Sequence, residues 1–308
     1  MKPPPTTEAS PRDNDDDDDP AKQLFARDGF LVLRNALSKD LLSEWQQFAS
    51  DYFEQCFEEL HQRGHTPFPC HYNGETYALG LGVKHGFREI VMRSPGRYEL
   101  SLLHCQEKAP SIRQFQSRLS VIPKLLSGDD VDTNNTTKSC WDDLSLCHLS
   151  LVVSTPGASE QSWHADGGHV STSQHLPCHV ANLFIPLAPV SLDLGPTEFR
   201  PGSHVYTRNL APLLLAAKAR KELRPPVAPL LDEGDVLVFD YRVLHRGKAN
   251  TTHDTNRPIL VLTFSQPWYK DVCNFPKNSL YDPPTTTEET TTTTATESQE
   301  KESKNAGA

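Results

Sequence analysis

The chain has 308 residues, and its 30 Lys and Arg stand against 40 Asp and Glu, for a formal net charge of −10. This balance excludes nucleic acid as an expected partner, because no basic excess exists to neutralise phosphates. No run approaches the roughly 18 consecutive apolar residues that cross a bilayer, so we expect no membrane segment.

The seven cysteines form no Cys-x-x-Cys pair, and no secretory signal precedes them. The C-terminal residues 305–308 match neither a peroxisomal tripeptide nor a prenylation box. These patterns predict reduced thiols and a cytoplasmic protein.

Two polar ends flank one apolar body. Residues 1–20 hold five prolines and seven acidic side chains, and nine of the twelve residues 285–296 are Thr. Such segments cannot bury enough apolar surface to offset the entropy lost on ordering. We therefore predict disordered tails over 1–20 and 283–308, and a single domain over 21–282.

The part of that domain before the first long strand, 21–147, has the pattern of a mainly helical segment. A short helix over 21–27 precedes an Asp-Gly turn and a strand over 30–33. Ser38 is then a suitable N-cap for a long helix whose apolar residues recur at three- and four-residue steps. This stripe predicts a buried face: Leu41, Trp45, Phe48, Tyr52, Cys56 and Leu60.

Further helices are predicted later in the chain. One begins near Ser111 and has Pro123 near its end, with Ile112, Phe115 and Leu119 facing inward. Residues 127–139 are rich in Gly, Asp and Asn and predict a surface loop, and a third helix is expected over 210–223.

Residues 148–270 have the pattern of a β core. Short apolar runs alternate with Pro, Gly and Asp, as in antiparallel sandwiches and barrels. The expected strands cover 149–154, 179–187, 235–239 and 259–265. The predicted fold class is mainly β with flanking α-helices.

Polar residues with metal-binding chemistry lie beside these strands. In an extended chain, residues two apart point to the same side, so His164 and Asp166 can direct an imidazole and a carboxylate at one point. His245 follows the apolar run over 235–239. Taken singly, an ordinary hydrogen-bonded pair and a structural histidine explain these residues. Together, two His and one carboxylate form the facial triad of non-haem Fe(II) oxygenases.

Arg257 stands twelve residues after His245, where the next apolar strand begins. A guanidinium that enters a buried strand needs an anion, and its fork of donors matches a carboxylate. An Arg at the exposed end of a strand is the alternative.

These segments resemble the phytanoyl-CoA dioxygenase-like family of Fe(II)/2-oxoglutarate-dependent oxygenases. The similarity rests on Asp28-Gly29-Phe30-Leu31-Val32, on Trp163-His164-Ala165-Asp166, on Pro201-Gly202-Ser203-His204 and on the stretch from Gly234 to Arg257. It covers roughly residues 21–270 and is tightest over 149–268.

The resemblance implies a double-stranded β-helix core (a cupin-like jelly roll) that holds iron through His164, Asp166 and His245. It implies that Arg257 binds the distal carboxylate of 2-oxoglutarate and that Asn182 also contacts this cosubstrate. Many relatives have Ser two residues after the Arg, where this chain has Ile259, so Thr263 is a candidate second group on that carboxylate.

The implied reaction is oxidation of a small molecule by O2 and 2-oxoglutarate, with release of succinate and CO2. Asp166 favours hydroxylation, because halogenating relatives have a small residue there. Substrate and oligomeric state cannot be predicted. One alternative is a non-catalytic oxygenase-like module that binds a ligand or partner, and another is a cupin-like Fe or Zn hydrolase that acts without 2-oxoglutarate.

Other polar and aromatic residues have less specific roles. Arg93 and Arg97 precede the β core and could bind an anion or face solvent. His169 and His175 are expected to face solvent, and His204 to support the Pro-Gly turn. The tryptophans expected to serve mainly in packing are Trp141, Trp163 and Trp268.

Overall fold

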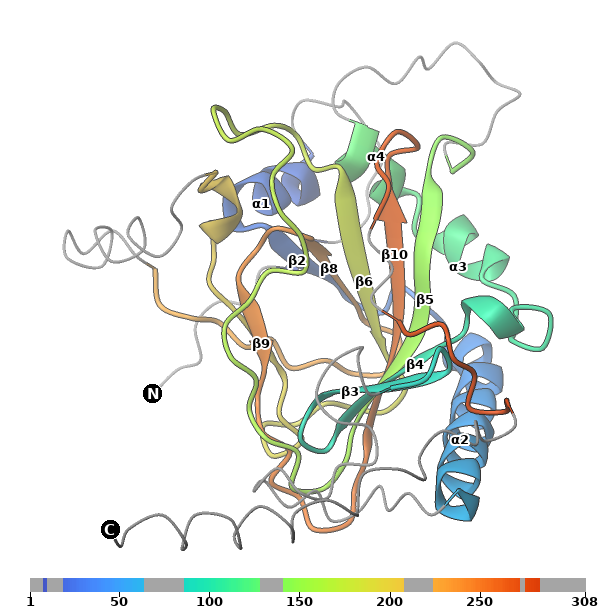
Figure 1. Ribbon diagram of the computed structural model, residues 1–308. Helices are drawn as coiled ribbons and strands as arrows, with labels where there is room; N and C mark the ends of the chain where they lie inside the picture. Colours follow the sequence, from blue (N-terminus) through green and yellow to red (C-terminus); the bar gives the residue numbers. More distant parts are fainter. Residues whose placement is uncertain are drawn as a thin grey trace, which may run out of the picture.

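The fold is built on one large β-sheet. The computed structural model describes residues 8–9, 19–63, 86–127, 141–207, 224–271 and 275–282. Eight of its strands pair in the order β1-β2-β8-β6-β10-β5-β4-β3 (Figure 1). The strands of this sheet are β1 (Glu8–Ala9), β2 (Phe30–Leu33), β3 (Ile90–Ser94), β4 (Arg97–Ser101), β5 (Ser145–Ser154), β6 (Val180–Pro186), β8 (Val236–Asp240) and β10 (Arg257–Ser265).

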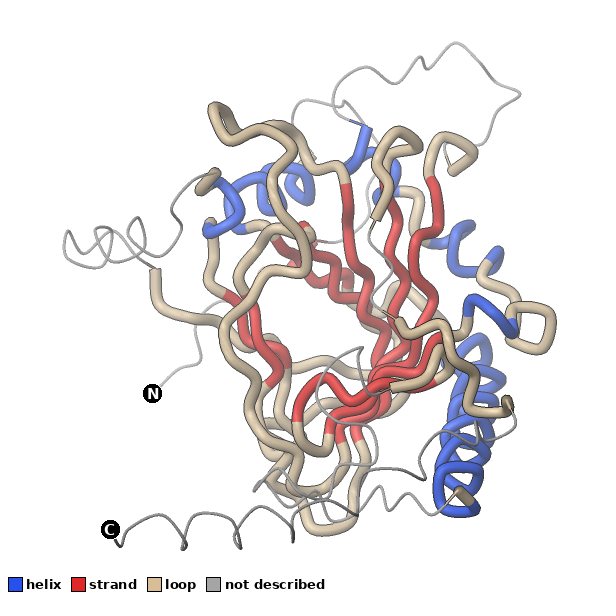
Figure 2. Tube along the Cα trace, in the orientation of Figure 1, coloured by secondary structure: helices blue, strands red, loops and turns tan. Residues whose placement is uncertain are grey.

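A second, two-stranded sheet lies across from the large one. It pairs β7 (Thr197–Phe199) with β9 (His245–Gly247), and an isolated bridge adds His164 to the β9 edge. Figure 2 shows this pair of strands on the opposite side of the domain from β5, β6 and β10. The two layers form the predicted jelly roll, the double-stranded β-helix of cupin-like oxygenases.

The central strand β10 shows how the sheet separates core from cavity. Its even-numbered residues Leu260, Leu262 and Phe264 are buried in the main hydrophobic cluster. Its odd-numbered residues Arg257, Val261 and Thr263 line a cavity between the two layers. This alternation follows from the two-residue period of a strand.

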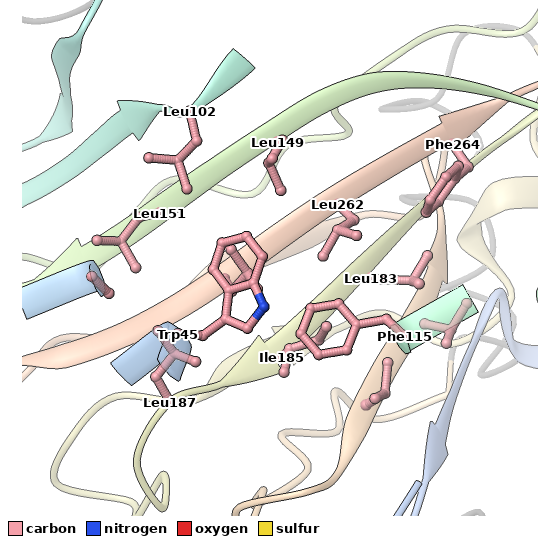
Figure 3. Close-up of a cluster of buried hydrophobic side chains, with 14 of the residues drawn as sticks. Trp45, Leu102, Phe115, Leu149, Leu151, Leu183, Ile185, Leu187, Leu262 and Phe264 are labelled. Atoms are coloured by element: carbon pink, nitrogen blue, oxygen red, sulfur yellow. The ribbon is translucent and has the colours of Figure 1, made fainter. Parts of the chain in front are cut away.

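Helices cover the outer face of the large sheet. The long helix α2 (Lys39–Gln62) packs Trp45 onto Leu residues of β5, β6 and β10, with Phe115 stacked on Trp45 at 5.7 Å (Figure 3). Ser38 occupies the N-cap position as predicted, although its side chain makes no capping hydrogen bond. Tyr52, Cys56 and Leu60 of the predicted stripe are buried as well. None of the described helices has the length and hydropathy needed to cross a membrane.

A smaller apolar cluster fills the space between the layers behind the site. Phe30 of β2 stacks on Phe199 of β7 at 4.5 Å, and Phe199 packs on Phe239 of β8 at 5.3 Å. Both Phe199 and Phe239 also contact the ring of His245. The cluster therefore supports one wall of the cavity.

The N-terminal part departs from the helical prediction in one important respect. Strands β3 and β4 form a hairpin that extends the large sheet at β5. The turn is Pro95-Gly96, with Gly96 at φ 73°, a conformation that favours glycine. Pro-Gly is a turn signal, and the prediction of a mainly helical segment did not take it into account.

Smaller differences concern the helices and the N-terminus. The helix predicted from Ser111 is two helices, α3 (Arg113–Arg118) and α4 (Val121–Ser127), and Pro123 lies in the first turn of α4, where its missing N–H costs nothing. The predicted first helix is α1 (Pro20–Asp28), and Asp19 caps it through the N–H of Ala21. The short strand β1 pairs in parallel with β2, whereas the sequence predicts disorder there. Except for Ser127, the loop predicted over 127–139 lies outside the described residues. The helix predicted over 210–223 also lies outside them.

Candidate metal and cosubstrate site

Backbone pairing brings His164 and His245 together from segments 81 positions apart. The N–H of His164 donates to the His245 carbonyl at 3.0 Å, and the N–H of His245 donates to the His164 carbonyl at 2.8 Å. The N–H of Asp166 donates to the carbonyl of Tyr241 at 3.0 Å. His164 and Asp166 thus stand two residues apart on a chain held extended beside β9.

The three side chains converge as the sequence predicts. One potential ligand atom from each of His164, Asp166 and His245 lies within 4.8 Å of the other two. The Nε2 atoms of the two imidazoles are 3.7 and 3.6 Å from the Asp166 carboxylate oxygens. His245 is buried, and burial lowers its pKa below the ordinary value. A neutral imidazole is the form that binds a metal.

Hydrogen bonds orient both imidazoles. The Nδ1 of His164 lies 2.8 Å from the Ser162 carbonyl, and the Nδ1 of His245 lies 3.1 Å from the Val243 carbonyl. Each carbonyl can only accept, so each Nδ1 carries a proton and each Nε2 presents its lone pair to the site.

Asp166 is oriented by a chain of two further side chains. Asn182 on β6 donates from Nδ2 to the Asp166 carboxylate at 2.6 Å, and Thr263 on β10 donates to Asn182 Oδ1 at 2.6 Å. Both line the cavity, where the family resemblance led us to expect contacts with 2-oxoglutarate. In the structure their polar groups hold the carboxylate of the triad.

Arg257 is a buried cation that contacts only neutral groups. Its guanidinium donates to the carbonyl of Gly195 and, at 2.8 Å, to the hydroxyl of Ser154. Its Nε has no hydrogen-bond partner among the described residues. Burial first, and then the charge of Arg97, lowers its pKa well below the ordinary value. An anion in the cavity would offset both the burial of the Arg257 charge and its repulsion by Arg97.

The hydroxyl beside this guanidinium belongs to Ser154, not to Thr263. Thr263 lies six residues from Arg257 on β10, a distance of roughly 20 Å at about 3.3 Å per residue. That separation is too long for the two residues to hold one carboxylate. Ser154 could have been identified only from the pairing of the strands, because β5 and β10 pair antiparallel and Ser154 is directly opposite Arg257.

The two arginines of the β3–β4 hairpin have different environments. Arg97 is buried and lines the cavity, and it donates to the carbonyls of Ser159 and Lys248 and to the side chain of Gln161. It adds a second buried positive charge near Arg257. Arg93 also lines the cavity but forms an ion pair with Glu99 at 2.6 Å.

The cavity between the layers has a volume of about 720 Å³. The triad, Arg257, Asn182 and Thr263 all line it. The metal-ligand set and the buried cation therefore face one cavity of a size suited to a small molecule.

The remaining predicted histidines lie close to one another and are not part of the triad. His175 is exposed as expected, whereas His169 is half-buried, and the two rings are 5.8 Å apart. His204 is buried beside the Pro-Gly turn and contacts the carbonyl of Ala26 through Nε2. Burial lowers the pKa of His169 to about 4.

Trp163 does more than pack. Two guanidiniums lie over its ring, with the Cζ atoms of Arg200 and Arg246 at 4.4 and 4.6 Å from the ring centroid. Arg246 is also paired with Glu198 at 2.7 Å. Because Trp163 precedes His164 and Arg246 follows His245, this stack connects the two ligand-bearing segments. Trp141 packs on Phe264 as predicted, and Trp268 is largely exposed and stacks on His179.

The sequence analysis did not predict one set of three polar side chains at the cavity wall. His148 of β5, Tyr241 and Asp271 form a hydrogen-bonded set beside the triad. Asp271 follows β10 in an irregular segment, so no spacing motif connects it to His148.

A jelly roll with an open set of two His and one carboxylate, and a buried arginine in the same cavity, defines the architecture of non-haem oxygenases. Comparison with known families agrees: the profile of phytanoyl-CoA dioxygenase (PhyH) matches residues 25–258. The chain belongs to this family.

Individual relatives are more distant. "Dioxygenase af480" of Aspergillus fumigatus (strain ATCC MYA-4609 / CBS 101355 / FGSC A1100 / Af293) is 27% identical over 140 residues, which are 44% of this chain and 41% of that protein. The chain spans less than two thirds of the length of the curated relatives it matches.

Solved structures show the same fold. The iron-bound structure of EctD from S. alaskensis has a TM-score of 0.53 at 18% identity, covering 90% of this chain and 85% of that one. AviO1 from Streptomyces viridochromogenes Tue57 has a TM-score of 0.52 at 21% identity, covering 82% and 96%.

Proposed function

We propose that this protein is an Fe(II)- and 2-oxoglutarate-dependent dioxygenase that hydroxylates a small molecule and releases succinate and CO2. The observation that carries the proposal is the convergence of His164, Asp166 and His245 within 4.8 Å, in the cavity that Arg257 also lines. The family membership and the iron bound by EctD, a protein of the same fold, support it.

The donor set fits Fe(II). Two imidazole Nε2 atoms and one carboxylate present themselves from one side, which leaves the opposite side open. Zinc favours a closed tetrahedral set in structural sites. With 2-oxoglutarate, iron would supply the activation of O2 and the hydroxyl transfer, which the protein cannot supply itself.

The chain's own residues position the reactants. Asn182 and Thr263 hold the Asp166 carboxylate in one orientation, and the carbonyls of Ser162 and Val243 fix the imidazole tautomers. Arg257 and Ser154 offer N–H and O–H donors to the distal carboxylate of 2-oxoglutarate. Arg97 adds positive charge, which suits a dianionic cosubstrate.

The test is an anaerobic titration of the purified full-length protein with Fe(II) and 2-oxoglutarate. We expect a weak visible charge-transfer band that His164→Ala abolishes. The control His253→Ala changes an exposed histidine that is absent from the cavity wall and should leave the band unchanged. Oxygen-dependent succinate release over a metabolite panel then identifies substrates.

The outcomes separate the proposal from its rivals. A folded protein that shows no band with Fe(II) and 2-oxoglutarate contradicts the proposal. Binding of a small molecule without succinate release in any condition favours the non-catalytic module. Turnover that proceeds without 2-oxoglutarate favours a hydrolase.

A further inference from the structure

A carboxylate-backed imidazole lies on the cavity wall outside the triad. His148 of β5 lines the cavity, and its Nε2 contacts the carboxylate of Asp271. The hydroxyl of Tyr241 lies 3.2 and 3.1 Å from the two oxygens of the same carboxylate. Side chains from three separate segments thus meet in one hydrogen-bonded set.

Strand register places this set at the level of the triad. His148 is opposite Thr263, and Thr263 is opposite Asn182, which donates to Asp166. Two strand spacings of about 4.8 Å put the backbone of His148 roughly 10 Å from that of Asn182. A small molecule at the metal site can therefore reach the His148 ring.

Tyr241 connects the set to the ligand-bearing loop. A Cβ on Gly167 would lie 2.1 Å from the Tyr241 ring, so the loop after Asp166 packs directly on this ring and a side chain at 167 would displace it. Asp271 is held by Tyr241 and His148 together, and the side chains of His148 and Asp271 are 13% and 10% exposed. The imidazole is therefore fixed in position, as a recognition group must be.

The free nitrogen of His148 defines the chemistry of its ligand. A carboxylate accepts from Nε2, so Nε2 carries a proton. Nδ1 makes no hydrogen bond with any described residue. A neutral ring would accept a hydrogen bond at Nδ1, and an imidazolium would donate one. A hydroxyl group can pair with either form, whereas a carboxylate or an ammonium can pair with only one.

The cavity that His148 lines also has apolar walls, which are suited to a carbon skeleton. Val261, Val152 and Phe184 line the same cavity on β10, β5 and β6. Polar groups, including Glu99 and Gln161, occupy other parts of the wall. Each of these two groups already has a partner on the wall, Arg93 for Glu99 and Arg97 for Gln161.

We propose that His148, held by Asp271 and Tyr241, is a substrate-positioning residue that binds a hydroxyl group, and that the substrate is a small hydroxylated molecule. This inference rests on the proposed dioxygenase function. The hydroxyl hydrogen-bonds to Nδ1 while the carbon skeleton of the substrate packs on Val261 and Phe184. The carbon that is oxidised is then held facing the triad.

The experiment measures oxygen-dependent succinate release with Fe(II) and 2-oxoglutarate. The probes are methyl glycosides, cyclitols and cyclic terpene alcohols, each paired with its deoxy analogue. We expect stimulation above the substrate-free rate in the hydroxylated arm and at least tenfold weaker stimulation by the matched deoxy compounds, since one buried hydrogen bond is worth about a factor of ten.

Variants of the set then test the residue itself. His148→Phe should raise the KM of the active probe about tenfold or more and leave the half-saturating concentration of the cosubstrate unchanged. His148→Gln, which keeps a hydrogen-bonding side chain, should recover part of this loss. Asp271→Asn, a milder change if His148→Phe folds poorly, should raise the KM of the same probe. His253→Phe is the matched control at an exposed histidine.

Three results would overturn the proposal. The first is stimulation by deoxy compounds that equals that of their hydroxylated partners. The second is a His148→Phe variant that weakens the binding of the cosubstrate and of the probe alike. The third is no stimulation by any hydroxylated probe in protein that shows the Fe(II)–2-oxoglutarate band. Loss of the band itself would instead count against the proposed function.

Discussion

Replacement of Arg257 by Met tests two separate effects of the buried charge, one on the stability of the apo protein and one on the binding of 2-oxoglutarate. The wild-type guanidinium is 2% exposed and has only neutral partners among the described residues. An unpaired buried ion costs several kcal/mol, and Met removes that cost. Met also loses the bonds to Ser154 and Gly195, at about 1–3 kcal/mol for each group left unpaired. We therefore expect the free energy of unfolding of the apo protein to change by no more than about 2 kcal/mol.

The ligand-bound state should respond differently. A ligand present at a concentration of 100 times its Kd stabilises the protein that binds it by about 2.7 kcal/mol. For a domain of this size, 1 kcal/mol moves Tm by about 2–4 °C. Wild-type protein should therefore gain about 5–10 °C on addition of 2-oxoglutarate, and Arg257→Met should gain almost nothing.

Thermal unfolding with Mn(II) in place of Fe(II), which avoids turnover, measures both quantities. Arg113→Met is the matched control, because Arg113 is exposed on α3. A full thermal shift with 2-oxoglutarate in Arg257→Met would show that Arg257 does not bind the cosubstrate. Loss of the shift caused by Mn(II) alone would also contradict this role, because the arginine would then be a structural support of the triad.

Two further predictions concern the surroundings of the triad. Trp163→Leu removes a ring that contacts both Arg200 and Arg246, and it should weaken Fe(II) binding about tenfold, as losses around metal ligands do. Competition with a chelator measures the Fe(II) affinity, and Trp268→Leu, at a largely exposed tryptophan, is the control. If the Trp163 variant is less stable but binds Fe(II) with unchanged affinity, the ring serves only in packing. Burial lowers the pKa of His169 to about 4 and also lowers the pKa of His204. As the pH drops from about 7 to 5, these histidines therefore bind protons in the unfolded chain before they do so in the folded protein, and the free energy of unfolding should fall. Urea unfolding at these two pH values should show a smaller fall in a His169→Asn/His204→Asn double variant, and equal falls would contradict the assignment.

Local pattern determined much of the β core. The apolar runs predicted over 149–154, 179–187, 235–239 and 259–265 form β5, β6, β8 and β10 close to their predicted bounds, because strand burial follows the two-residue period. The same period predicted that His164 and Asp166 point to one side. The chemistry of a facial triad and of a buried guanidinium pointed to His245 and Arg257, which the structure places in the same cavity.

Other features depend on pairing between segments that are distant in sequence. The register of β10 on β5 decides that the hydroxyl beside Arg257 is that of Ser154, and the register of β10 on β6 places Thr263 opposite Asn182. The β3–β4 hairpin is stabilised by its pairing with β5, which its own short strands do not reveal.

The contact between His148 and Asp271 shows the same limit of the sequence. Asp271 lies in an irregular segment, and its neighbours in the chain give no sign of a partner 123 residues earlier. Residues within a strand or a short motif are placed by local geometry, which the sequence encodes directly. Residues that meet across the cavity are placed by strand order and register, which only the assembled sheet fixes.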